Sequence, residues 1–259
     1  MAAKSIGFIG GGRIARILLD GWKLGRSLPE VVRVSDQNAE SLEKLRRLHP
    51  GIEPSSGDNA PPASCDIVFL ALHPPAIPGV LEGIRDHLRP DATLVSLAPK
   101  IPLARLSELA GGIRNVVRVI PNAPSIVGDG YNPIAFSGSI APEAKKELVA
   151  LLRVLGNCPV VPEDSLEAYA ILAAMGPTYL WFQLDELLRL AKSFGLNPKD
   201  AMEATCRMAA GAAKTLRESG LSPEDVIDLV PVKPLADDEE KIREIYRTKL
   251  SALYRKLKA

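Results

Sequence analysis

The chain is poor in the residues that build disulfide frameworks and metal centres. Its 259 residues include only three cysteines and three histidines. Cys65, Cys158 and Cys206 lie far apart without a CxxC pair, and no histidine stands at a metal-ligand spacing from them. This pattern argues against a disulfide-stapled fold and a structural zinc site. It predicts a protein of the reducing cytoplasm that binds no metal.

Excess charge and long apolar runs are also lacking. Lys and Arg number 32 against 31 Asp and Glu, which gives a formal net charge of +1. Such a balance argues against a nucleic-acid partner or a strongly charged protein partner. No segment approaches the roughly 20 consecutive apolar residues that a membrane-spanning helix needs. We therefore expect a soluble protein without nucleic-acid or membrane partners.

The most informative motif lies near the N-terminus, where the apolar residues 6–9 precede Gly10-x-Gly12-x-x-Ala15. In such a motif the first glycine allows a tight turn, and the second lets the backbone approach a pyrophosphate. The small Ala15 lets the following helix pack closely on the strand. Free N–H groups and the dipole at the helix N-terminus favour the negative charge of the phosphates. The motif predicts a dinucleotide-binding strand, turn and helix.

The next residues strengthen this interpretation over that of a purely structural turn. We expect a helix from Arg13 to about Leu24 and a strand at 31–34. Asp36 follows that strand, 21 positions after Ala15, close to the spacing of about 20 for an acid that holds the ribose hydroxyls. An acid without a neighbouring arginine favours NAD. Because Arg13 could still reach a phosphate, NAD and NADP both remain open.

Alternating strand and helix patterns extend to about residue 163. Beyond 36, the sequence predicts a loop between 48 and 66, strands at 66–72, 92–97, 115–120 and 159–161, and helices at 39–48, 78–88, 103–109 and 142–155. This alternation predicts an α/β fold with a Rossmann-type, doubly wound parallel sheet. From residue 164 onward only helical periodicity is found. We predict a dinucleotide-binding Rossmann domain at 1–163 and an all-helical domain at 164–259.

The last predicted helix, at about 237–257, carries one apolar stripe, which could cap its own domain or meet a partner subunit.

Several segments, in order along the chain, resemble those of pyrroline-5-carboxylate reductases. They are Ile6–Ala15, Val34–Asp36, Ala71–Pro74, Arg118–Gly130 and Gly176–Tyr179. The most specific is the run Arg-Val-Ile-Pro-Asn-x-Pro that starts at Arg118. The resemblance implies hydride transfer from NADPH or NADH to the C=N carbon of a five-membered imine carboxylate, which yields proline. It also implies a homodimer, or a larger assembly, formed through interlocking C-terminal helices.

The resemblance also assigns the cofactor site. The glycine loop matches the phosphate loop, Asp36 and Asn59 lie on the adenosine side, and the turn at 71–74 lies near the middle of the cofactor, with His73 in the place of a lysine. The turn at 121–124 carries the nicotinamide end. The resulting cofactor-binding set is Gly10, Gly12, Arg13, Ile14, Ala15, Ser35, Asp36, Asn59, Ala71, Leu72, His73, Pro74, Pro121 and Asn122. An alternative for Asn122 is that its side chain only fixes its own loop.

Two departures from the family concern the substrate. The family's Ser-Gly-Ser-Gly-Pro-Ala-Tyr segment reads Ala173-Ala-Met-Gly-Pro-Thr-Tyr179 here, so both serines are missing. The Ser-Pro-Gly-Gly-Thr-Thr loop that grips the substrate carboxylate is replaced by Val230-Pro-Val-Lys-Pro-Leu-Ala236, whose prolines remove amide donors. Each unsatisfied group should cost about 1–3 kcal/mol.

The substrate-binding candidates that remain are Asn122, Thr178 and Lys233. Lys233 could serve as a point charge for an anionic substrate, or it could simply be an exposed lysine. The catalytic residue, including the proton donor, stays unknown.

Two functions are in competition. The first is an NAD(P)H-dependent reductase of the pyrroline-5-carboxylate reductase type that acts on a cyclic imine or a related small substrate. The second is a family member that has lost catalysis and binds dinucleotide as a sensor or partner protein. A hydroxy-acid dehydrogenase of the 6-phosphogluconate type is disfavoured, because its glycine-rich helix with a catalytic lysine has no counterpart after Gly176.

Overall fold

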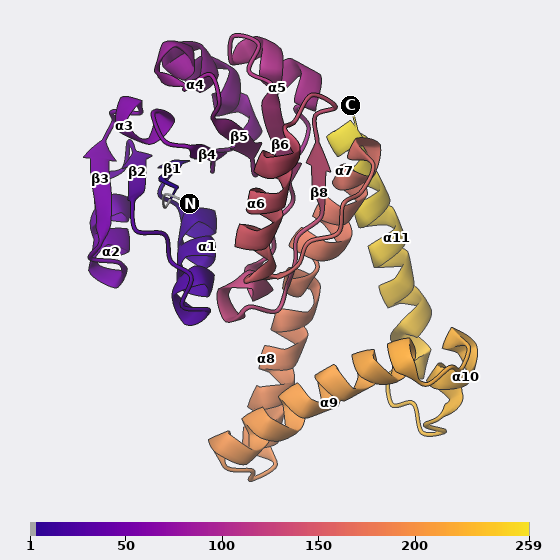
Figure 1. Cartoon of the computed structure of the whole chain (residues 1–259). Coiled ribbons are helices and arrows are strands. Elements are labelled where there is room, and N and C mark those ends of the chain that lie inside the picture. Colours follow the sequence, from indigo (N-terminus) through magenta and orange to yellow (C-terminus); the bar gives the residue numbers. More distant parts are fainter. Residues whose placement is uncertain (1–3, 259) are drawn as a thin grey trace. The chain divides into compact units, whose positions relative to one another are not determined.

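The computed structural model describes residues 4–258 and divides them into two compact units (Figure 1). The first unit contains the described chain up to Met175 together with the residues from Tyr254 onward, and the second spans Gly176–Leu253. This division falls later than the predicted boundary at residue 164, because Leu166 and Ala170 are buried in the core of the first unit.

The first unit is built on a seven-stranded sheet with the order β3-β2-β1-β4-β5-β6-β8. Six strands run parallel, and β8 is antiparallel to β6. The predicted α/β fold with a doubly wound sheet is therefore confirmed. The strands are β1 (Ile6–Ile9), β2 (Val32–Asp36), β3 (Ile52–Ser56), β4 (Ile67–Leu70), β5 (Thr93–Ser96), β6 (Asn115–Val119) and β8 (Ile134–Phe136), with β7 (Gly130–Tyr131) and β9 (Gly156–Asn157) in a separate pair.

Helices cover both faces of this sheet, and strand side chains alternate between two hydrophobic clusters. Phe8 and Phe69 point into one cluster, whereas Ile9 and Leu70 point into the other, as expected of strands buried on both sides. The helices of this unit are α1 (Arg13–Leu24), α2 (Ala39–Leu48), α3 (Ala60–Ala63), α4 (Ile77–Ile84), α5 (Leu103–Leu109), α6 (Pro142–Arg153) and α7 (Leu166–Tyr169). Shorter turns are η1 (Pro74–Ala76), η2 (Arg85–His87), η3 (Ala123–Val127), η4 (Glu163–Ser165) and the π-helical η5 (Ala170–Ala174).

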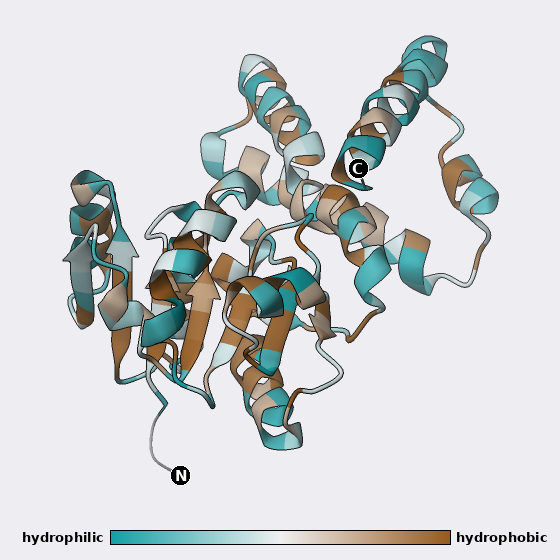
Figure 2. Cartoon of the chain, turned by 90° about the horizontal axis from the view of Figure 1, so that it is seen from above, coloured by the Kyte–Doolittle hydropathy of each residue, from teal (hydrophilic) through white to brown (hydrophobic). Residues whose placement is uncertain are grey.

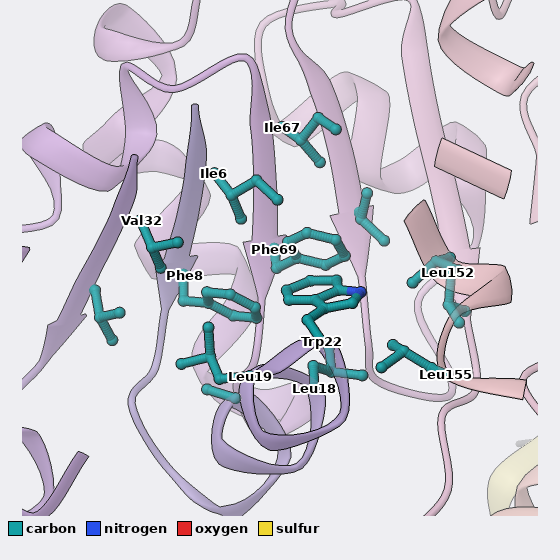
Figure 3. Packing of buried hydrophobic residues seen from close by; sticks show 14 of the residues in the cluster. Ile6, Phe8, Leu18, Leu19, Trp22, Val32, Ile67, Phe69, Leu152 and Leu155 are labelled. Atoms are coloured by element: carbon teal, nitrogen blue, oxygen red, sulfur yellow. The ribbon is translucent and has the colours of Figure 1, made fainter. Parts of the chain in front are cut away.

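Trp22 lies at the centre of the first cluster and fixes α1 against the sheet (Figure 3). Its ring centroid is 6.0 Å from that of Phe8 and 5.9 Å from that of Phe69, and these two phenylalanines stack at 5.0 Å. The indole N–H donates to the carbonyl of Leu151 at 2.9 Å. Since α1 follows β1 directly, this packing also fixes the turn between them.

Two predictions about local structure are wrong. The segment expected to be a loop between 48 and 66 contains β3 and α3. Because β3 lies at the edge of the sheet, it tolerates Pro54, which lacks an N–H for a ladder. The strand expected at 159–161 is reduced to one bridge between Val160 and Ile134, since Pro159 and Pro162 interrupt the backbone donors around it.

The second unit is helical, as predicted. It contains α8 (Pro177–Ser193), α9 (Pro198–Glu218), α10 (Pro223–Asp228) and α11 (Ala236–Lys258) up to Leu253. The side chains of Asn197 and Ser222 cap α9 and α10 by accepting backbone N–H groups at 2.9 and 3.1 Å. Apolar and polar residues alternate around these helices (Figure 2), and α8 and α11 contain no buried residue within the described chain.

Within residues 4–258, no helix has both the length and the apolar character needed to cross a membrane.

A buried ion-pair network joins β6 to the segment that leads out of the sheet. Arg118, only 2% exposed, donates through Nη1 to Glu163 Oε1 at 3.0 Å and through Nη2 to Glu167 Oε1 at 2.5 Å. The same two oxygens accept the backbone N–H groups of Leu103 and Lys100. Burial opposes ionisation of Glu167, but the hydrogen bond and charge of Arg118 outweigh it and lower the pKa of this carboxyl.

Replacing Glu167 by glutamine should destabilise the protein, because Arg118 loses the charge of its most buried partner. We expect a loss of about 1–3 kcal/mol in the free energy of unfolding at pH 7, measured by urea titration. The same change at the exposed Glu40, which pairs with Lys44, should leave stability unchanged.

This difference between wild type and Glu167→Gln should depend on pH. Since the folded-state pKa of Glu167 lies below its unfolded value of about 4.3, the stabilisation is fully present above that value. It is lost as pH falls through the folded-state pKa. If the difference in unfolding free energy between wild type and Glu167→Gln stayed the same at pH values well below the folded-state pKa, the ionised Glu167 would not be its cause.

Candidate functional site

The site lies where the strand order of the sheet reverses. Chain connections place β2 and β3 on one side of β1, and β4, β5 and β6 on the other. In open α/β sheets, ligands bind outside the carboxyl ends of the strands at such a reversal. A cavity of about 570 Å³ lies there. Residues that follow β1, β4, β5 and β6 line it, with one residue of α2: Gly12, Arg13, Ile14, Ala71, Leu72, His73, Pro74, Leu97, Ala98, Pro99, Pro121 and Ser41.

Residues 10 and 12 of the loop are glycines for different physical reasons. Gly10 has a φ of +103°, and a Cβ there would lie 2.4 Å from the carbonyl oxygen of Ala71. Residue 10 must therefore be glycine for the turn and for the close approach of β4. A Cβ at Gly12 would meet no atom within 4 Å. Gly12 is not required by packing, and its missing side chain leaves open space in the cavity.

This space fits a diphosphate. Gly12 is the N-cap of α1, no side chain caps this helix, and its first turn has no acidic residue. The first N–H groups of a helix lack intrahelical partners and attract anions. Arg13 and Ile14, the first two residues of α1, line the same cavity, whereas Ala15 is buried against the sheet. A nicotinamide dinucleotide contains a diphosphate of this kind, and the residues present fit it.

Asp36 is held beside the glycine loop at the end of β2. Its Oδ2 accepts the N–H of Gly11 and its Oδ1 accepts the N–H of Asn38, both at 2.8 Å. The neighbouring Ser35 is buried and donates to Asn59 Oδ1 at 2.7 Å. The structure thus places Asp36, Ser35 and Asn59 together at the carboxyl end of β2, on the side of the glycine loop predicted for adenosine.

The turn after β4 faces the glycine loop across the cavity. The N–H of Ala71 donates to the carbonyl of Ile9 at 2.8 Å, so this turn is tied to the end of β1. Ala71, Leu72, His73 and Pro74 all line the cavity, and the side chain of His73 is exposed. The predicted middle of the cofactor site therefore lies close to the predicted phosphate loop.

The structure gives Asn122 a structural role. Asn122 Nδ2 donates to the carbonyl of Ala173 at 3.4 Å, and Oδ1 accepts the N–H of Tyr131 at 3.0 Å. Its own N–H donates to Asn132 Oδ1, which also accepts the hydroxyl of Ser125. These bonds support the alternative in which Asn122 holds its own turn. Pro121 lines the cavity, and contact of Asn122 with a ligand stays a prediction.

Two buried polar residues, Arg118 and Asn132, make contacts that the sequence did not reveal. Asn132 holds the turn that begins at Pro121 by accepting the N–H of Asn122, whereas Arg118 ties β6 to Glu163 and Glu167. The only available signal was a polar residue in an otherwise apolar strand or turn, which by itself does not name its partner.

The other two predicted substrate residues lie in the second unit. Thr178 stands exposed in the first turn of α8. Lys233 Nζ lies 3.7 Å from Asp228 Oδ1, and Lys233 borders a separate cavity of about 660 Å³ together with Leu235 and Tyr246. The ion pair with Asp228 supports the interpretation of Lys233 as an exposed lysine, and both substrate roles stay predictions.

Filling the open space at Gly12 tests whether the cavity holds a dinucleotide. We expect Gly12→Val to weaken binding of NADH or NADPH at least about tenfold, because the side chain occupies the place of the diphosphate. The melting temperature should fall only slightly, since a Cβ meets no atom there and the loss comes from valine being a poorer N-cap than glycine. Gly51→Ala, also in open space but outside the cavity lining, should leave binding unchanged. Equal binding by wild type and Gly12→Val would contradict this placement.

Two family models match the chain. The model described as NADP oxidoreductase coenzyme F420-dependent matches residues 5–100, which contain the glycine loop, Asp36 and the turn at 71–74. The model described as pyrroline-5-carboxylate reductase dimerisation matches residues 163–233.

Curated proteins and solved structures agree with these matches. The chain is similar to the pyrroline-5-carboxylate reductases of Methanosarcina acetivorans (29% identity, 89% of this chain and 85% of that protein) and Escherichia coli (26%, 88% and 84%). It also matches the solved reductase from Coxiella burnetii, with 26% identity, a TM-score of 0.74 and coverage of 99% and 98%. The NADP-bound Plasmodium falciparum pyrroline carboxylate reductase shares the fold, with a TM-score of 0.84 at 20% identity and coverage of 100% and 98%. Over most of its length the chain is thus similar to pyrroline-5-carboxylate reductases, and its C-terminal helices match the dimerisation model of that family.

Proposed function

We propose that the protein is an NAD(P)H-dependent reductase that transfers hydride to the C=N carbon of a cyclic imine or a related small substrate. The observation that carries this proposal is the cavity at the strand-order reversal, with its open glycine loop. That cavity lies largely within the region matched by the NADP oxidoreductase model. The curated relatives that cover most of this chain are named pyrroline-5-carboxylate reductases.

The chain's own residues bind and orient the cofactor, which supplies the hydride when bound. The N–H groups at the start of α1 hold the diphosphate, and Asp36 holds the adenosine ribose. Ala71, Leu72, His73 and Pro74 then contact the middle of the dinucleotide, and the turn beginning at Pro121 supports its nicotinamide end. Holding donor and acceptor at short distance converts an encounter in solution into a reaction within one complex, which is the main contribution a protein makes to hydride transfer.

The substrate differs from that of the relatives or is held differently. Residues 230–235 are exposed and contain Pro231 and Pro234, so this stretch offers few N–H groups to a carboxylate. The match to the dimerisation model ends within it, at Lys233. Lys233 and Thr178 are the candidates in this unit for contact with an anionic or polar group of the substrate.

We propose that the protein forms a homodimer through its C-terminal helices, or a larger assembly made of such dimers. Large apolar side chains of α8 and its end remain uncovered in the single chain: Trp181 is 52%, Phe182 67% and Phe194 77% exposed. Such faces need a covering partner, and the match to a dimerisation model favours a second copy of this chain. Light scattering of the purified protein should give twice the 27.8 kDa chain mass or a multiple of it, and a monomer would contradict the dimer.

A cytoplasmic location is also proposed, because Cys65, Cys158 and Cys206 are free thiols, as is usual in a reducing compartment. Cell fractionation with an antibody to the protein tests this location.

The activity is tested by the decrease of NADH and NADPH absorbance with pyrroline-5-carboxylate and a panel of other cyclic imines. We expect turnover with at least one imine and slower turnover with pyrroline-5-carboxylate than in relatives that carry the glycine-containing loop. Gly12→Val should reduce the rate at subsaturating cofactor.

Binding of the cofactor without turnover of any imine would contradict the reductase. That result would favour the second candidate, a sensor or partner protein that binds dinucleotide, which is suggested by the proline-containing stretch at 230–235.

A further inference from the structure

The carboxylate of Asp36 is fixed in place relative to the glycine loop. One oxygen accepts the N–H of Gly11 and the other accepts the N–H of Asn38, each at 2.8 Å. Both bonds are to backbone, and Gly11 itself is buried. If the side chain rotated away from a ligand at the end of β2, the N–H of the buried Gly11 would lose its acceptor. Each oxygen still has a free lone pair for a hydroxyl.

None of the basic side chains of β2 and α2 pairs with Asp36. Four basic side chains come from β2 and α2: Arg33 pairs with Glu53, Lys44 with Glu40, and Arg46 and Arg47 with Glu43. Among the described ion pairs none involves Asp36. The negative charge of Asp36 is thus not neutralised by a cation from these elements.

The start of α2 is also unsuited to a phosphate. Asn38 Oδ1 accepts the N–H of Ser41 at 3.1 Å, which occupies one of the free donors of this helix. Its first turn carries Glu40, and a negative charge there competes with an anion. The end of β2 therefore presents a fixed carboxylate and a capped helix, with acceptors for hydroxyl groups and no free cation.

We propose that Asp36 makes this protein select NADH over NADPH. This inference rests on the proposed function and names the cofactor used at the same site. The carboxylate accepts hydrogen bonds from the hydroxyls of the adenosine ribose, and such charge-assisted bonds are stronger than neutral ones. A phosphate on the 2′-oxygen would remove one of these donors and place a like charge next to a carboxylate that cannot turn away.

Arg13 is the one arginine or lysine among the described residues that line the cavity. It is exposed and could bind a 2′-phosphate. However, Arg13 is the first residue of α1, next to Gly12, where the diphosphate common to both cofactors is expected. We therefore assign Arg13 to the diphosphate, so that its loss weakens both cofactors alike.

The test is a fluorescence titration of the full chain with NADH and with NADPH at constant ionic strength, from which the ratio of the two dissociation constants is obtained. Wild type should bind NADH at least about tenfold more tightly. Asp36→Asn removes the charge but keeps the shape, and it should bring the ratio close to one. Arg13→Ala should weaken both cofactors and leave the ratio unchanged. Asp91→Asn is the control, because Asp91 precedes β5 at the amino end of the parallel strands and does not line the cavity; it should change neither affinity.

Three results would overturn the inference: equal or tighter binding of NADPH by wild type, an unchanged ratio in Asp36→Asn, or a loss of NADPH affinity alone in Arg13→Ala. The ratio of the NADH and NADPH dissociation constants of wild type tests the inference even if Asp36→Asn fails to fold. Binding of both cofactors with a ratio near one overturns the selection by Asp36 and leaves the reductase intact. If neither cofactor binds, the reductase itself is overturned, and the inference with it.

Discussion

The close approach of two backbone segments at Gly10 is the constraint on which the candidate site depends. With a φ of +103° and no room for a Cβ against the carbonyl of Ala71, Gly10 lets the ends of β1 and β4 meet. The N–H of Ala71 then reaches the carbonyl of Ile9. These are the two strands between which the sheet order reverses. A side chain at residue 10 would separate their ends and enlarge the distance between the glycine loop and the turn at 71–74.

Packing in the rest of the first unit fixes the position of the turn between β1 and α1. Trp22 packs against both Phe8 and Phe69 and holds α1 against the same two strands, so the N-terminus of the helix has a fixed position. Asn132 holds the turn that begins at Pro121, which lines the opposite side of the cavity, by accepting the N–H of Asn122. We therefore expect the affinity for the cofactor to depend on core side chains such as Trp22, because they determine where the N–H groups at the start of α1 lie.

Most of the fold could be predicted from the sequence, because it follows from local pattern. The apolar runs of β1, β4, β5 and β6 and the helical periodicity between them indicated the parallel sheet. The strand β3 could not be recognised, because Pro54 and polar neighbours give it the composition of a loop, and only pairing with β2 makes it a strand. By contrast, Pro159 and Pro162 were a local signal that the stretch around Val160 forms a single bridge and not a full strand.

The candidate site was predictable where one short motif carries it and unpredictable where distant residues meet. The glycine loop and the turn at 71–74 follow strand ends and line one cavity, and Asp36 lies beside the loop, where it accepts the N–H of Gly11. The bonds of Asn122 to Tyr131 and Ala173 depend on the path of the chain after β6, which periodicity does not contain. Lys233 looked like an isolated charge in the sequence, and its pairing with Asp228 became visible only in three dimensions.

The most direct measurement is a crystal structure of the protein grown with saturating NADH. The account predicts electron density for the diphosphate against the N–H groups at the start of α1, with the adenosine ribose beside Asp36. Density for the dinucleotide elsewhere on the chain, or an empty loop at a concentration that saturates binding in solution, would contradict it.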